Sequence, residues 1–213
     1  MTSDLDLRER RELADLFDEL GPDAPTLCGE WTTSDLAAHL VVRERDPIGA
    51  SGILIPRFED LTARHMAGEL AKHGYAGTVE RVRTGPPFGP MAIAPVRHAV
   101  NLLEYFVHHE DVRRPNGRTA RTDRPDLDAE LWGFLGRMGP LMVRRAKLPS
   151  ICLTLVTPSG EERTLGKGDA EVTLFGTPGE LVMELYGRQA HADVTYEGPA
   201  ASVAAVRGAS FGI

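Results

Sequence analysis

The sequence has few cysteines, no excess of basic residues and no long apolar run. Its two cysteines, Cys28 and Cys152, form neither a CxxC motif nor the framework of a small secreted domain. The 24 basic residues are outnumbered by 31 acidic residues, and the net charge of −7 argues against a nucleic-acid-binding surface. No stretch approaches the roughly 20 apolar residues of a membrane-spanning helix, and the charged N-terminal segment lacks the apolar core of a signal peptide. We therefore expect a cytoplasmic protein with two free thiols that binds neither nucleic acid nor membranes.

The first half of the sequence has the pattern of amphipathic helices. The chain of 213 residues is long enough for one large domain or two small ones, and its 42% hydrophobic content is ordinary for a globular protein. In RRELADLFDEL, the apolar residues Leu13, Leu16, Phe17 and Leu20 recur at the spacing of one helix face. The segment GPDAP at 21–25 is expected to end this helix.

A second helix is expected to begin after Trp31, with Thr32 or Thr33 as N-cap and Asp35 in its first turn. Further helical stretches are FEDLTARHMAGELAKHG, a short one around TVERV, and VRHAVNLLEYFVHHEDVRR, the longest expected in this half. The connecting segments GASGILIP and GPPFGPMAIAP are expected to be irregular. Four main helices joined by modest loops predict a bundle.

The pattern changes at RPNGRTARTDRPD, residues 114–126, which is polar, contains proline and is typical of a linker. Beyond it, LDAELWGFLGRMGPLMVRRA predicts a helix that is interrupted near Gly139 and Pro140. The segments ICLTLVT, EERTL, AEVTLF and ADVTYEG predict strands, whereas GTPGELVMELYGR and PAASVAAV predict helices. The expected fold class is α+β, with a four-helix-bundle domain at 1–118 and a smaller α+β domain at 119–213.

The segment NLLEYFVHHEDVRR, residues 101–114, carries ionisable side chains on an otherwise apolar helix. Glu104 and His108 are four residues apart and therefore share a helix face. His39 lies on the second helix, so a bundle can bring its side chain to the same point. Two imidazoles and a carboxylate suit zinc, and three protein ligands leave one coordination position open for water or substrate.

A plainer interpretation of these residues stays open at this point. A Glu and a His four residues apart are, taken alone, more often a surface salt bridge or hydrogen bond. A single histidine such as His39 is likewise more often a half-buried core residue than a metal ligand. Periodicity alone does not decide between the two interpretations.

Two motifs carry a resemblance to a known family. The segment PTLCGEWTTSDLAAHLVVRERDP, with a W-x-x-x-D-L-x-x-H core, and the segment EYFVHHEDVRR together resemble the mycothiol-dependent maleylpyruvate isomerase family. That family is related to the DinB-like metal-binding bundles. The segment VTLFGTPGELVMELYGR resembles its second domain, which is similar to sterol carrier protein type two, so the resemblance covers nearly the whole chain.

The resemblance implies a metal site and a thiol cofactor. The family's metal ligands are a His in the first motif and a Glu and a His four residues apart in the second, which fall on His39, Glu104 and His108. The implied metal is zinc, with nickel as the alternative, and the implied thiol is mycothiol.

Other residues near the motifs have two interpretations each. Asp111 matches an acidic position of the family motif and is expected to accept the second N–H of His108, or else to pair with Arg113 or Arg114. His109 points about 100° away from His108 around the helix, so we expect it to have a structural role.

Two arginines are candidates for binding an anionic substrate or the thiol cofactor. Arg43 lies one turn after His39, and the alternative is a solvated position in the RER run. Arg188 matches an arginine-bearing turn of the family's second domain. Cys28 is expected to be a small buried thiol that does not reach the metal.

The expected function is that of a zinc- and mycothiol-dependent enzyme. A thiol deprotonated at the metal would attack a small electrophilic substrate, giving cis–trans isomerisation or thiol transfer. The alternatives are a metal- or thiol-binding protein without turnover and a metal-dependent hydrolase. The expected partners are mycothiol and the electrophile, and the chain is expected to be a monomer or a homodimer.

Overall fold

A computed structural model describes residues 4–54, 56–89, 92–148 and 150–211 of the chain. The chain forms two compact units, Met1–Thr119 and Ala120–Ile213. The domain boundary predicted between residues 118 and 119 lies beside the boundary between these units. Within the described residues, no helix combines the length and the hydropathy that crossing a bilayer requires.

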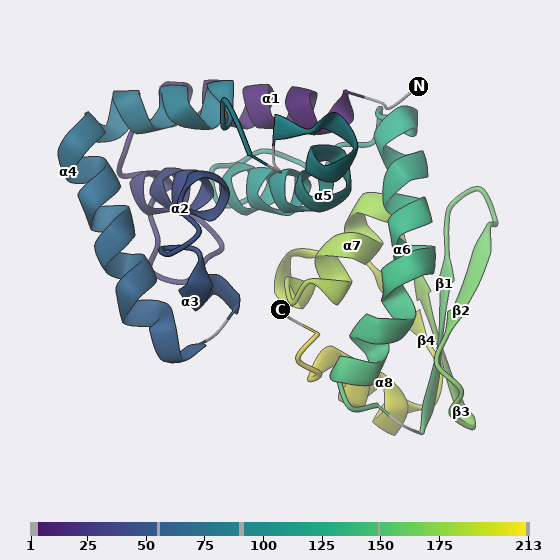
Figure 1. The fold of residues 1–213 in the computed structure, drawn as a ribbon. Helices are drawn as coiled ribbons and strands as arrows, with labels where there is room; N and C mark the ends of the chain where they lie inside the picture. Colours follow the sequence, from purple (N-terminus) through teal and green to yellow (C-terminus); the bar gives the residue numbers. More distant parts are fainter. Residues whose placement is uncertain (1–3, 55, 90–91, 149, 212–213) are drawn as a thin grey trace. The chain divides into compact units, whose positions relative to one another are not determined.

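The first unit is helical (Figure 1). Its elements, in chain order, are α1 (Leu5–Leu20), α2 (Thr33–Arg45), the short α3 (Ser51–Leu54) and 3₁₀ turn η1 (Pro56–Phe58), α4 (Glu59–Thr84) and α5 (Ala94–Arg113). Helix α1 packs against α4 and α5, and α2 packs against α4. The predicted helical N-terminal region is therefore confirmed. Helix α3 lies inside the segment GASGILIP, which was expected to be irregular, and η1 follows at its end.

Local signals explain where these helices begin and break. Thr32 is the N-cap of α2, and both its backbone N–H and its hydroxyl donate to the Asp35 carboxylate at 2.9 Å. Gly74 has φ 65° and ψ 176° inside α4 and kinks it. The kink falls between the two helical stretches that the sequence predicts for this region.

The core of the first unit is built from the apolar faces of four helices. Buried side chains from α1, α2, α4 and α5 form one cluster, which includes Leu13, Phe17, Leu36, Leu40, Val79, Val82, Tyr105 and Val112. Helices α2 and α5 therefore share one interior, which places the motif residues on both helices within reach of one another.

The second unit combines three helices with a mixed four-stranded sheet, which confirms the α+β fold class. Its elements are α6 (Pro125–Arg145), β1 (Ile151–Val156), β2 (Glu162–Leu165), β3 (Ala170–Phe175), α7 (Pro178–Leu185), 3₁₀ turn η3 (Gln189–His191), β4 (Thr195–Glu197) and α8 (Ala200–Arg207). The strand order is β2-β1-β3-β4, with β1 and β3 parallel and the other pairs antiparallel. Helix α6 packs against α7 and β2 (Figure 1).

One expectation for this unit is wrong. Helix α6 runs through Gly139 and Pro140 without the predicted interruption. Pro140 removes one backbone donor, but the absence of a side chain at Gly139 lets the helix lie on β2: a Cβ there would come within 2.7 Å of the Leu165 side chain. Packing on the sheet therefore outweighs the local helix-breaking signal.

Candidate metal centre

Helices α2 and α5 bring the three predicted metal ligands together. His39, Glu104 and His108 each offer one ligand atom, and these atoms all lie within 4.8 Å of one another. The rings of His39 and His108 meet edge-on, with centroids 5.3 Å apart. The fold thus groups the side chains of His39, Glu104 and His108. Their role as metal ligands is a proposal.

The two ring nitrogens of His108 face different partners. Nε2 lies 3.6 Å from Oε2 of Glu104, and Nδ1 lies 3.0 Å from Oδ2 of Asp111, whose side chain is fully buried. Although burial favours the neutral ring, the hydrogen bonds with Asp111 and Cys28 and the charges of Asp111 and Glu104 raise the pKa of His108 to about 10. The two carboxylates therefore favour the imidazolium form of His108.

His39 has the opposite electrostatic character. Its side chain is buried beside Trp31, with ring centroids 5.1 Å apart. Burial, followed by the nearby charges of His108 and Arg43, lowers the pKa of His39 to about 3. Its Nδ1 is buried and has no hydrogen-bond partner among the described residues. His39 is thus a neutral imidazole with an unused nitrogen, which is the protonation state that metal binding requires.

Cys28 belongs to a second donor group that shares His108. Its Sγ donates to Oδ2 of Asp111 at 3.2 Å and lies 3.8 Å from Nδ1 of His108, so Cys28, His108 and Asp111 also form a candidate metal-binding trio. The backbone explains this position, because the Leu27 N–H donates to the Asp111 carbonyl at 2.9 Å and ties the loop before α2 to α5. Cys28 thus contacts His108 from the Asp111 side, which no helical periodicity could have predicted for a loop residue, and its absence from the ligands around His39 stays a prediction.

Arg43 lies at the edge of the site, and a hydrogen bond with Asn101 holds its guanidinium. Its Nε is 3.4 Å from Oε2 of Glu104, and its Nη1 donates to Oδ1 of Asn101 at 2.8 Å. The Asn101 amide in turn donates to Glu44, which also accepts a hydrogen bond from the buried Arg10 at 2.6 Å. Because Glu44 can only accept, the amide oxygen of Asn101 must face Arg43, which fixes the guanidinium beside Glu104.

The remaining candidates have other contacts within their own units. His109 is buried, and its Nδ1 lies 3.1 Å from Oε2 of Glu9 on α1. With Glu9 and Glu12 it forms a third group of potential ligand atoms, which contains neither His39 nor Glu104. Arg188 belongs to the second unit, where its Nη1 donates to the Tyr186 carbonyl at 2.6 Å, so its role in the site stays a prediction.

The residues around His39 fit a divalent zinc-like ion. Two imidazoles and one carboxylate are ligands that zinc accepts, and they form fewer than the four that a closed structural site uses. The partnerless nitrogen of His39 is an orphaned buried polar atom of the kind that a bound ion satisfies. Asp111, on the far nitrogen of His108, has the position of a carboxylate that orients a ligating imidazole.

Comparisons with known proteins support the fold. No protein-family model matches the chain, and no curated protein matches it either. The structure is similar to the crystal structure of the mycothiol-dependent maleylpyruvate isomerase, with a TM-score of 0.59 and 16% sequence identity. The match covers 91% of this chain and 89% of that chain. At this identity the similarity establishes a shared fold and leaves the activity as a proposal.

Proposed function

We propose that the protein is a zinc-dependent enzyme that uses a low-molecular-weight thiol, mycothiol, to act on a small electrophile. The reaction is a cis–trans isomerisation or a thiol transfer of the maleylpyruvate isomerase type. The observation that carries the proposal is the convergence of His39, Glu104 and His108 in a chain that shares the fold of an enzyme dependent on mycothiol.

Two of the three donor groups have the charge that a metal site needs, and the third, His108, gives up a proton when the ion binds. His39 is held neutral by burial, and Glu104 supplies one negative charge. His108 donates its Nδ1 proton to Asp111, which leaves Nε2 directed toward Glu104 and a bound ion. When bound there, zinc would supply the positive charge that favours the thiolate form of an incoming thiol.

Arg43 is the chain's own group for orienting an anion at this site. Its guanidinium is always charged and is fixed beside Glu104 by Asn101. A carboxylate of the substrate or of the thiol cofactor can pair with it. Arg188 is proposed to have a similar role on the basis of the family motif alone.

The test measures metal content and turnover together. Purified protein, His39→Ala and Glu104→Ala are analysed for bound zinc and nickel, and then incubated with mycothiol and a panel of electrophiles that includes maleylpyruvate. We expect one metal ion in the unsubstituted chain, a sharp loss in both variants because two ligands do not hold zinc stably, and isomer or adduct formation only with thiol and metal.

A matched control is His73→Gln, which changes a half-exposed histidine of α4 outside the three donor groups. It should keep both metal and activity, and thermal unfolding should show all variants folded. Equal metal in all variants would refute the site. Turnover without thiol would indicate a hydrolase, and metal uptake without turnover would indicate a binding protein.

A further inference from the structure

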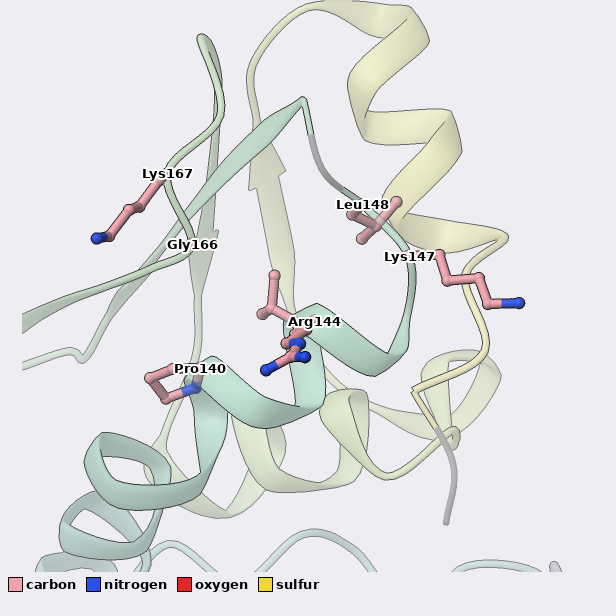
Figure 2. A pocket seen from close by; sticks show the side chains of 7 residues that line it. Pro140, Arg144, Lys147, Leu148, Gly166 and Lys167 are labelled. Atoms are coloured by element: carbon pink, nitrogen blue, oxygen red, sulfur yellow. The ribbon is translucent and has the colours of Figure 1, made fainter.

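The second unit contains a cavity of about 440 Å³ that is unrelated to the donor groups of the first unit. It lies where the C-terminal turn of α6 meets the turn between β2 and β3. The cavity is lined by Pro140, Val143, Arg144, Lys147, Leu148, Gly166 and Lys167 (Figure 2). Its size is within the range of small-molecule pockets.

The cavity lining combines an apolar wall with three cations. Val143 is buried and Leu148 is half-buried, and both line the cavity. Arg144, Lys147 and Lys167 are exposed, and Figure 2 shows Arg144 between the two lysines, whose amino groups point away from it to opposite sides. No acidic residue is among the lining residues. A ligand that fits must therefore carry a negative charge at one end and an apolar body at the other.

These cations differ from several arginines of the first unit. Arg10, Arg43, Arg83 and Arg97 all pair with carboxylates. Within the described part of the chain, by contrast, Arg144, Lys147 and Lys167 make no salt bridge. In a protein with a net charge of −7, three unpaired cations around one cavity are a site of charge complementarity for an anion.

Helix-end electrostatics explains only part of this arrangement. Arg144 is in the last turn of α6, where a cation is favourable beside the unpaired carbonyl groups. Lys167 comes from a different segment, so the helix end does not account for it. Gly166, with φ 95°, brings that segment close: a Cβ at Gly166 would come 3.4 Å from the Val143 side chain. The backbone thus places Gly166, the residue before Lys167, beside the apolar wall.

A second cavity in the same unit has the opposite lining. It has a volume of about 320 Å³ and is lined by Glu180 and Asp193 among neutral residues, with no basic side chain. An anion should be disfavoured there. The two cavities therefore give an internal comparison for any binding experiment.

We propose that the cavity at the end of α6 binds a small amphipathic anion, a carboxylate or phosphate group on an apolar body. The Arg144 guanidinium receives the anionic group in bidentate geometry. Lys147 and Lys167, whose exposed side chains point outward in Figure 2, can turn toward the bound anion, and the apolar body lies against Val143 and Leu148. The proposal does not depend on the metal site of the first unit.

The test follows the binding of octanoate to the full-length, isotopically labelled chain by NMR, below the micelle concentration. We expect saturable shifts centred on Gly166 and Lys167, and much weaker binding of acetate, octanol and octylammonium. Arg144→Gln should weaken octanoate binding by about tenfold, the usual value of one charge-assisted hydrogen bond. Octyl phosphate in a parallel titration identifies which anionic group is preferred.

The matched control is Arg145→Gln, which removes the same charge from the neighbouring exposed residue that does not line the cavity. It should change the affinity by less than about twofold. Lys167→Gln is a second variant, expected to weaken binding severalfold should Arg144→Gln fail to fold. Equal effects of Arg144→Gln and Arg145→Gln, equal binding of octanol, or shifts centred on Glu180 and Asp193 would overturn the proposal. Binding to anionic phosphatidylglycerol vesicles without binding to monomeric octanoate would overturn it as well.

Discussion

In the first unit, Arg43 and Arg10 are held by Glu104 and Glu44 in a continuous chain of hydrogen bonds. In the second unit, Arg144, Lys147 and Lys167 surround a cavity without such partners among the described residues. The difference follows from burial. A charge inside the helical unit is costly unless it is paired, whereas an exposed cation keeps its hydration until an anion replaces it.

The comparison separates two kinds of binding site. The first is preorganised, because its donor groups already hold one another at close range. The second is adaptable, because long exposed side chains supply its charge. We therefore expect single substitutions in the first unit to have large effects that depend on chemical identity, and substitutions in the second to have smaller effects that depend on charge and position.

The largest expected effect distinguishes the two donor groups that share His108. Glu104→Gln should lower zinc affinity by at least about 100-fold, because it removes one of three ligands. Cys28→Ser should change it by less than about tenfold, since Sγ lies on the Asp111 side of His108. Both affinities are measured by competition with a chromophoric chelator. The reverse order would assign the ion to Cys28, His108 and Asp111.

The next effect concerns pH. Zinc must displace the proton from His108, whose pKa is raised to about 10, whereas His39 is already neutral because its pKa is lowered to about 3. Zinc affinity should therefore rise by about tenfold per pH unit between about pH 7 and 9. Calorimetry in buffers of different ionisation enthalpy should show about one proton released per ion. A flat profile would contradict the charged state of His108.

A milder effect is expected at Asp111. Asp111→Asn keeps the shape of the side chain but removes the charge that orients Nδ1 of His108. Zinc affinity or turnover should fall by about 10- to 100-fold, the range for a carboxylate behind a ligating imidazole. Asp35→Asn is a suitable control, because Asp35 accepts hydrogen bonds from Thr32 at the start of α2 and belongs to none of the donor groups. An unchanged zinc affinity would leave Asp111 with a purely structural role.

The smallest effect is expected in the second unit. Lys147 has φ 55°, a left-handed conformation that costs a non-glycine residue about 1–2 kcal/mol. Lys147→Gly should raise the free energy of unfolding by about 1 kcal/mol while weakening octanoate binding severalfold. Chemical denaturation and the NMR titration measure the two quantities. Loss of stability on this substitution would show that the lysine side chain contributes to packing.

The sequence predicted most of the helices and strands, because each depends on local signals. The apolar spacing in α1, the capping residues Thr32 and Asp35, and the alternation in β1 are read within a few residues of one another. The parallel pairing of β1 with β3 was not predicted, since it depends on how distant strands associate. The same limit applies to α6, whose continuity at Pro140 reflects packing on β2.

The candidate site likewise has residues that local sequence signals predict and residues that only the association of distant segments brings together. Glu104 and His108 share a face because they are four residues apart, and the family motif paired them with His39. The position of Cys28 next to Asp111 was not predicted. It depends on a loop that a backbone hydrogen bond from Leu27 to Asp111 holds against α5. The hydrogen-bonded support of Arg43 by Asn101 and Glu44 joins residues on two helices and likewise has no signature in either segment alone.

Glu104 is paired with Arg43 and His108 through side chains of the protein itself. Chelation should therefore leave a folded protein, in contrast to small zinc domains that collapse when stripped of their ion. Binding of the proposed ion would then exchange it for the proton of His108 without unfolding the chain.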